Sequence, residues 1–184
     1  SGPLEPTNEG YAVAKIAVSR LCKYSNSQFG TDFKTLIPCN LYGKYDDFDL
    51  KKAHLIPGVI HRMHLHKNSG KECIAIWGDG SARREFMYAS DLADFICFAL
   101  SEYNSVPEEI NVGLGFDFTV KEYYQMIAEE IEYSGKFEFD LSKPTGMKQK
   151  LVDVSKQEAL GWSPPTNTRE AIRKTYRHFL DAWN

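Results

Sequence analysis

"YAVAKIAVSRLCKYSNSQFGTDFKTLIPCNLYG" (residues 11–43) decides the fold class, because a helical pattern is followed at once by a strand pattern. Apolar residues recur at helical spacing through its first part, and Gly30 suits the left-handed position that ends a helix. The second part, "DFKTLIPCNLYG", predicts a short buried strand that runs into a loop at Pro38. A helix that leads directly into a buried strand is the first unit of an α/β pattern.

The same alternation continues to the end of the chain. Further strands are predicted in "CIAIW", "REFMY", "EEINV" and "KFEFDL". Further helices are predicted in "IPGVIHRMHLHKNSG", from a cap at Ser90 to about Ser101, from a cap at Thr119 to a stop at Gly135, after Ser155, and in "NTREAIRKTYRHFLDAW". We therefore expect an α/β fold.

The composition is that of an ordinary soluble globular protein of 184 residues, 42% of them hydrophobic and 26% charged. A net charge of −3 gives no basic surface, so we expect neither nucleic acid nor a membrane as a partner. No apolar run approaches the roughly 18 residues of a membrane span, and the first ten residues lack the pattern of a signal peptide. The cysteines are widely spaced, which predicts free thiols in a reducing cytoplasm: Cys22, Cys39, Cys73 and Cys97.

Tyr11 and Lys15 form the first candidate catalytic pair. Residues four apart lie on one face of a helix, so both side chains can reach the same point. An ammonium group near a phenol favours the phenolate, which suits proton transfer to or from a sugar or alcohol oxygen. The same spacing arises by chance about once in a chain of this composition. Two surface side chains on a helix are therefore the alternative.

Two other motifs look chemical but favour a simpler interpretation. "HRMHLH" contains His61, His64 and His66, but no further ligand stands at a suitable spacing. We therefore expect a solvated helix face and no metal site. "GLGFDF" begins like a dinucleotide-binding fingerprint, but Phe118 stands where the third glycine belongs, so a strand end with a turn is expected.

Motifs in a fixed order carry a resemblance to a known family. "LEPTNEGYAVAK", "NLYG" with "HLIP", and "WGDGSARREF" follow one another as in the extended short-chain dehydrogenase/reductase superfamily. Those enzymes modify nucleotide sugars on an NAD(P)-binding Rossmann fold. Within the superfamily the chain most resembles the GDP-L-fucose synthases, which are GDP-4-keto-6-deoxymannose 3,5-epimerase-4-reductases. The resemblance runs through essentially all 184 residues.

The resemblance implies catalytic roles for three residues. Tyr11 would protonate the C4 oxygen of the substrate while NADPH delivers hydride, and Lys15 would hold the nicotinamide ribose. His54 would be the acid of the epimerisation at C3 and C5, and all three would contact the cofactor. On the residue types alone, His54 could equally be a loop histidine with a backbone hydrogen bond and no catalytic role. The implied cofactor loop, "PCNL", consists of Pro38, Cys39, Asn40 and Leu41.

The resemblance also implies a set of residues that hold the GDP-sugar. Guanidinium groups bind a diphosphate through paired charged hydrogen bonds, and an indole packs on a flat apolar surface. For one of the arginines, Arg83 is a competing candidate beside Arg84. The implied substrate residues are Arg62, Trp77, Arg84, Lys136 and Lys150.

The chain resembles only the C-terminal part of such an enzyme, because no glycine-rich βα turn for the cofactor pyrophosphate is present. The resemblance implies that residues 1–50 form the last helix and strand of the Rossmann domain. Residues 51–184 would form mainly the substrate-binding domain, with about 86–101 returning to the Rossmann domain. The intact enzyme would use NADP(H) and form a homodimer, whereas this chain alone would neither bind the cofactor tightly nor transfer hydride.

Other functions remain open on the sequence. A sister enzyme, such as a nucleotide-sugar 4-epimerase, a 4,6-dehydratase, or a heptose or colitose reductase, would share the Tyr-Lys pair and the Rossmann core. A binding module without catalysis would need the substrate residues but not Tyr11. A structural fragment with an exposed sheet edge would be prone to self-association.

Overall fold

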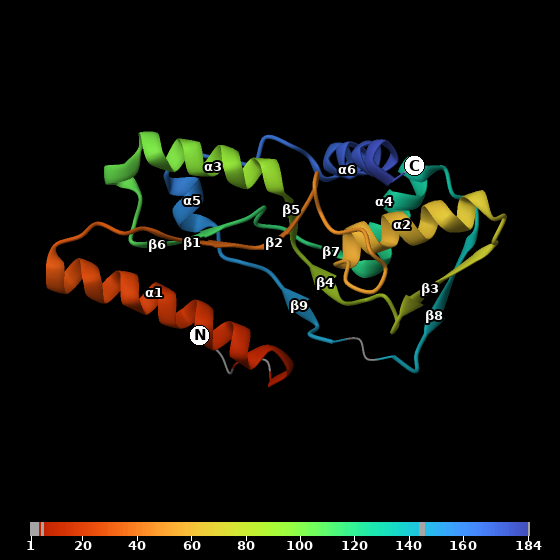
Figure 1. Ribbon diagram of the computed structural model, residues 1–184, viewed down its shortest axis with the longest axis horizontal. Coiled ribbons are helices and arrows are strands. Elements are labelled where there is room, and N and C mark those ends of the chain that lie inside the picture. Colours follow the sequence, from red (N-terminus) through yellow and green to blue (C-terminus); the bar gives the residue numbers. More distant parts are fainter. Residues whose placement is uncertain (1–3, 5, 144–145, 184) are drawn as a thin grey trace.

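The computed structural model describes residues 4, 6–143 and 146–183 and shows an elongated molecule (Figure 1). Its helices are η1 (Pro6–Asn8), α1 (Glu9–Phe29), α2 (Leu55–Asn68), α3 (Ala89–Ser101), η2 (Tyr103–Ser105), α4 (Val120–Ile131), α5 (Ser155–Ala159) and α6 (Thr168–Trp183). Its strands are β1 (Thr35–Pro38), β2 (Asn40–Tyr42), β3 (Cys73–Trp77), β4 (Arg83–Arg84), β5 (Phe86–Tyr88), β6 (Glu109–Val112), β7 (Phe118–Thr119), β8 (Lys136–Asp140) and β9 (Gln149–Lys150). The predicted α/β alternation is confirmed, and most strand pairs are parallel.

The strand that follows α1 changes neighbours at Pro38. β1 pairs in parallel with β6, whereas β2 pairs in parallel with β5. Proline has no N–H with which to continue a ladder, and the next N–H, of Cys39, donates to the carbonyl oxygen of Val112 at 2.9 Å. The predicted strand is thus present, but a second short strand stands where a loop was expected.

Two hydrophobic clusters form the interior. The smaller cluster joins α3 and the residues after α5 to β1, β5 and β6: Cys39, Met87, Phe95, Ala99, Val106, Ile110, Val112 and Trp162. The larger cluster joins α2, α4 and α6 to the β3–β8 pair and is rich in aromatic rings, including Phe48, Tyr123, Tyr124 and Phe179. The division into a cofactor part and a substrate part stays a prediction, and this packing would add β6 and α5 to the cofactor part.

A three-stranded sheet lies between these two clusters in Figure 1. β4 is its central strand and pairs antiparallel with β7 on one side and parallel with β9 on the other. The strands come from three distant parts of the sequence. This small sheet therefore brings together residues whose proximity no local pattern predicts.

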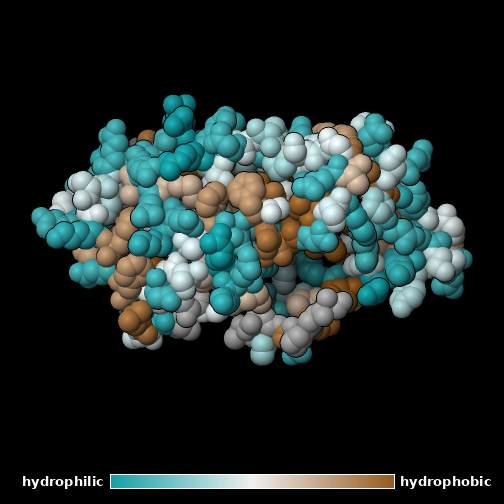
Figure 2. Space-filling model, turned by 180° about the vertical axis from the view of Figure 1, so that it is seen from behind, coloured by the Kyte–Doolittle hydropathy of each residue, from teal (hydrophilic) through white to brown (hydrophobic). Residues whose placement is uncertain are grey.

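α1 is 21 residues long but contributes no buried residue to the described structure. The side chain of Leu21 is 66% exposed, and Ile37 of the adjacent β1 is 42% exposed. Figure 2 shows hydrophobic side chains around a hollow near the middle of the rear face. The four residues of β1 are half-buried or exposed, so the expectation of a buried strand is wrong for β1. Within the described residues, no helix has the length and apolarity needed to cross a membrane.

Most predicted helix ends are confirmed, and two are wrong. Gly30 ends α1 in the left-handed region with φ 65°, and Thr119 caps α4 through a reciprocal capping box with Glu122. α3 begins after Tyr88 rather than after Ser90. α4 ends at Ile131, because the next residue already adopts a positive φ of 60°.

Candidate functional site

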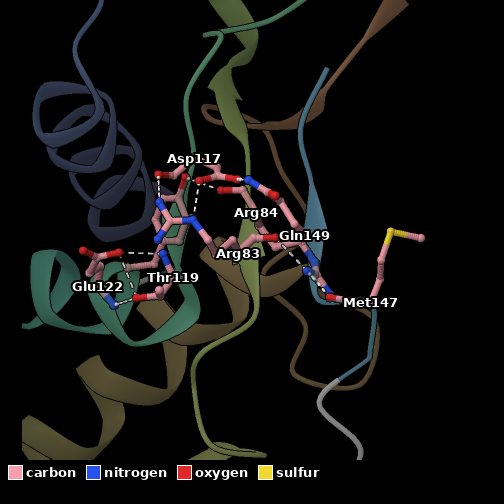
Figure 3. A network of polar contacts seen from close by, with 8 residues as sticks. Arg83, Arg84, Asp117, Thr119, Glu122, Met147 and Gln149 are labelled. Atoms are coloured by element: carbon pink, nitrogen blue, oxygen red, sulfur yellow. Dashed lines mark hydrogen bonds and ion pairs between the residues drawn. The ribbon is translucent and has the colours of Figure 1, made fainter. Parts of the chain in front are cut away.

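Two adjacent arginines in β4 have different partners (Figure 3). Nε of Arg83 donates to Oδ1 of Asp117 at 2.6 Å, and its Nη2 donates to the carbonyl oxygen of Asp117 at 2.8 Å. Nη1 of Arg84 donates only to backbone carbonyl oxygens, of Arg83 at 2.7 Å and of Met147 at 2.6 Å. Burial lowers the pKa of the Arg84 guanidinium. The charge of Arg83 is thus neutralised by Asp117, whereas no described carboxylate neutralises that of Arg84.

Arg84 and Lys150 are direct neighbours across the parallel β4–β9 pair. Neither forms an ion pair with a carboxylate in the part of the chain that the structure describes. Nζ of Lys150 donates instead to Oδ1 of Asn40 at 3.1 Å. Adjacent like charges repel, so this pair of cations is suited to an anionic ligand that lies between them.

Trp77 stands at the end of β3 with 62% of its surface exposed. Nζ of Lys143 lies 5.8 Å from the centre of its ring, a cation–π arrangement. The Asp140 turn holds the two residues together, because the N–H of Gly78 donates to the carbonyl oxygen of Asp140 at 2.9 Å. An exposed indole beside a lysine can pack on a flat ring and attract its charged substituents.

The other two predicted substrate residues, Arg62 and Lys136, have different surroundings. Nη2 of Arg62, on α2, donates to the hydroxyl of Tyr124 at 2.6 Å, and among the described residues Arg62 has no carboxylate partner. Lys136 opens β8, while Asp140, opposite Trp77, ends it. Four residue steps along the strand separate these ends by about 13 Å. The structure therefore does not bring Lys136 together with Trp77.

Two cavities are lined by residues outside β4 and β9. One has a volume of about 450 Å³ and is lined by α4 residues and by Tyr133, Ser134 and Gly135. The other, of about 320 Å³, shares these three residues and includes Lys136. Arg84, Lys150 and Trp77 line neither cavity.

The "PCNL" loop lies where β1 gives way to β2. Cys39 is 7% exposed, and burial together with the nearby Glu85 carboxylate raises the pKa of its thiol to about 12. Its sulfur therefore stays protonated at neutral pH and is not a base. Nδ2 of Asn40 donates to the carbonyl oxygen of Glu85 at 2.7 Å, so this loop is tied to the strands that carry the two cations.

Tyr11 and Lys15 lie on the first turns of α1. Nζ of Lys15 is 5.4 Å from the centre of the Tyr11 ring, and the Tyr11 side chain is 62% exposed. α1 runs antiparallel to β1 in Figure 1, and Ser19 contacts Glu109 at the start of β6. Eight residues of helix span about 12 Å, slightly more than the roughly 10 Å length of β6. Tyr11 is therefore level with the carboxyl end of this strand pair, where the "PCNL" loop begins.

His54 is the N-cap residue of α2 and is exposed, just before the helix as predicted. Burial raises the pKa of Asp46, and the nearby His54 lowers it in part. Asp46 is therefore within electrostatic reach of His54. No hydrogen bond from the His54 side chain is formed within the described residues, so its ring is available to a ligand.

The expectation of a solvated face for the three histidines of α2 is wrong. Each Nδ1 has a partner: the carbonyl oxygen of Phe48 for His61, the hydroxyl of Tyr176 for His64, and the carbonyl oxygen of Cys73 for His66. Across the described ranges, no three His, Cys, Asp or Glu side chains come together as a group that could hold a metal ion.

Three features of the site were missed by the sequence reasoning. The side chain of Asn40 bridges to Lys150, although only its backbone was considered. Glu85 lies within the "RREF" motif, but the motif alone does not indicate a role for it. Lys143 had no signal, because its place above Trp77 depends on a turn that lies far away in the sequence.

The chain is similar to proteins of a known family. The NAD dependent epimerase/dehydratase family matches residues 1–113. The chain is 50% identical to the GDP-L-colitose synthase of Yersinia pseudotuberculosis over 187 residues, covering 100% of this chain and 60% of that protein. It is 45% identical to the GDP-L-fucose synthase of Azorhizobium caulinodans, covering 97% of this chain and 57% of that protein.

The fold is shared with the solved structure of a reductase. The GDP-mannoheptose C4 reductase of Campylobacter jejuni, with NADP bound, matches with a TM-score of 0.84 and 28% identity. That match covers 97% of this chain and 62% of the reductase. The chain thus spans about three-fifths of the length of the proteins that it matches.

Proposed function

Because the chain belongs to the NAD dependent epimerase/dehydratase family, we propose that it carries the substrate site of an NADPH-dependent 3,5-epimerase/4-reductase. Its substrate is a GDP-linked 4-keto-6-deoxy sugar, and its product is GDP-L-fucose or a related GDP-deoxysugar. The similarity to the GDP-L-fucose synthase and to the GDP-L-colitose synthase supports this assignment. The proposed activity belongs to the full-length protein.

The pair Arg84 and Lys150 is the observation that carries the proposal. Two cations stand side by side on neighbouring strands, and neither has a carboxylate partner among the described residues. A diphosphate supplies the missing negative charge and can accept a fork of hydrogen bonds from the guanidinium group. Trp77 would pack on another part of the nucleotide sugar, and Arg62 would complete the charged lining. Lys136 is the weakest of the implied contacts, because it lies at the other end of β8.

The residues present fit the nicotinamide end of an NADP(H) cofactor. Tyr11 and Lys15 are side by side, and in this proposal they act at the end of the strands where α/β folds bind nucleotides. Pro38, Cys39, Asn40 and Leu41 would border the nicotinamide. When bound, NADPH supplies the hydride that reduces C4. Tyr11 then donates a proton to the C4 oxygen, and Lys15 stabilises the phenolate that remains.

His54 is proposed as the proton donor of the epimerisation. The 4-keto group lets C3 and C5 lose their protons as enolates, and an exposed imidazole can return a proton to the opposite face. His54 also borders the nicotinamide in this proposal.

A colitose-type or heptose-type reductase is the second candidate. It is favoured by the 50% identity to the GDP-L-colitose synthase, which exceeds the 45% identity to the GDP-L-fucose synthase. The GDP-mannoheptose C4 reductase match is consistent with the same candidate.

We further propose that the full-length protein is cytoplasmic, in agreement with the four free cysteines of this chain. We also propose that it forms a homodimer. This chain alone would not bind NADP(H) tightly.

Turnover by the full-length protein that contains this chain tests the proposal. With NADPH and GDP-4-keto-6-deoxymannose, we expect one NADPH to be consumed for each GDP-6-deoxysugar formed. Exchange of solvent deuterium into C3 and C5 distinguishes epimerisation from reduction alone. Tyr11→Phe is expected to lower kcat by about 100-fold or more without weakening GDP binding. Turnover of a UDP-linked sugar but not of the GDP-linked sugar would contradict the proposal.

A further inference from the structure

Glu85 is a fully buried acid between β4 and β5, with 0% of its surface exposed. Its carboxylate forms no ion pair with any described lysine or arginine. Instead, Oε1 accepts the N–H of Leu114 at 2.6 Å and of Gly115 at 3.0 Å, and Oε2 accepts the N–H of Val152 at 2.9 Å. One side chain thus joins β4 to the loop after β6 and to the segment after β9.

The backbone of Glu85 joins the same segments. Its N–H donates to the carbonyl oxygen of Lys150 at 3.3 Å. Its carbonyl oxygen accepts Nδ2 of Asn40 at 2.7 Å, and Oδ1 of Asn40 accepts Nζ of Lys150 at 3.1 Å. Glu85 therefore contacts the backbone of Lys150 directly and its Nζ through Asn40. Glu85 also directly follows Arg84, the other cation of the pair.

The space around the carboxylate is tightly filled. A Cβ added at Gly113 would overlap Oε1 of Glu85 and would lie 2.7 Å from a methyl carbon of Val152. Burying a carboxylate without a cation is costly, and the three N–H donors compensate only while all three stay in place. A site that needed only stability would be better served by an apolar side chain.

We propose that Glu85 is a positioning residue for the GDP-sugar. It fixes the segment Lys150–Val152 against β4, so that Arg84 and Lys150 are held at one spacing for the diphosphate. This inference rests on the proposed function, because it assigns a purpose to the geometry of that same anion site.

Glu85→Gln tests the inference with little change in size. One end of the amide becomes an NH₂ group that faces a backbone N–H, so at least one of the three bonds is lost. We expect the dissociation constant for GDP, measured by calorimetry on this chain, to rise about tenfold. In the full-length enzyme we expect KM for the GDP-sugar to rise by a similar factor, with kcat changed less than about twofold.

A core variant controls for loss of stability. Ile172 is fully buried in α6, away from the proposed site, so Ile172→Val or Ile172→Ala can be chosen to match the Tm of Glu85→Gln. The matched variant is expected to bind GDP like the unmodified chain. If Glu85→Gln does not fold, Gly113→Ala displaces the carboxylate without removing its charge and is expected to weaken GDP binding in the same direction.

The outcomes separate the inference from the proposed function. GDP binding by Glu85→Gln that equals that of the Tm-matched core variant would overturn the positioning role alone. Unchanged binding by Gly113→Ala would do the same if that variant has to be used. Absence of GDP binding by the unmodified chain would overturn the proposed function and the positioning role together.

Discussion

Replacing each of the two β4 arginines with methionine is predicted to have opposite consequences. Arg83 is paired with Asp117, whose side chain is 5% exposed, whereas the partners of Arg84 among the described residues are backbone carbonyl oxygens. Arg83→Met should therefore mainly affect stability. Arg84→Met should mainly affect the binding of GDP.

The sizes of the two effects follow from these contacts. Breaking a buried ion pair costs about 3–5 kcal/mol, but the Arg83 side chain is 42% exposed, so about 2 kcal/mol is expected. For a chain of this length that is a fall in Tm of about 4–8 °C. Arg84→Met loses two neutral-acceptor hydrogen bonds at the surface, worth about 1 kcal/mol together. A lost charged contact to the diphosphate costs about 2 kcal/mol, or about 30-fold in Kd.

Thermal unfolding and calorimetry with GDP measure both effects on the same samples. Arg83→Met is expected to change the Kd for GDP less than about threefold. Arg84→Lys keeps the charge but loses the planar fork, so its Kd should lie between those of the unmodified chain and Arg84→Met. The reasoning would be refuted if Arg83→Met weakened GDP binding more than Arg84→Met did.

Three further predictions concern the fold. Burial, with His61 and Lys67 nearby, lowers the pKa of His64 from its ordinary value of 6.5. The stability that neutral His64 contributes is therefore complete above about pH 6.5 and is lost as the pH falls. Urea unfolding at about pH 7.5 and 5.5 should show that the free energy of unfolding falls less on acidification for His64→Gln than for the unmodified chain. An equal fall in both would contradict this. Thr119→Ala removes the cap of α4 and should cost about 1 kcal/mol, whereas Thr119→Ser should not; thermal unfolding compares them, and equal Tm values would disprove the capping role. A thiol reagent should label the exposed Cys97 in the native protein and Cys39 only after unfolding, since Cys39 is buried and its pKa is about 12; rapid native labelling of Cys39 would show this to be wrong.

The fold was largely predictable because its signals are local. Helical spacing, the glycine after α1 and the threonine before α4 act through their immediate neighbours, and each is confirmed. At the two ends that failed, the local signal was misleading. Ser90 is a common capping residue but lies inside α3, and α4 stops before Gly135, at a glutamate with positive φ.

The site was only partly predictable because it depends on non-local pairing. Sequence could not choose between Arg83 and Arg84, since the choice is made by Asp117, which arrives on another strand. The pairing of β4 with β9 joins residues that lie far apart in the chain, so the neighbourhood of Arg84 and Lys150 had no local pattern. The same limit applied to the histidines of α2, whose partners come from three other segments.

Titration of this chain with GDP, followed by NMR of its three tryptophan indole N–H signals, tests the central claim most directly. Trp77 is exposed and is proposed to pack on the bound nucleotide sugar, whereas the indole of Trp162 donates to Asp94 and Trp183 packs on Phe179. We predict that the Trp77 signal shifts together with the backbone amides of β4 and β9, while the other two indoles stay in place. An unmoved Trp77 signal at saturating GDP, with shifts at the Tyr133–Gly135 cavities instead, would contradict the account.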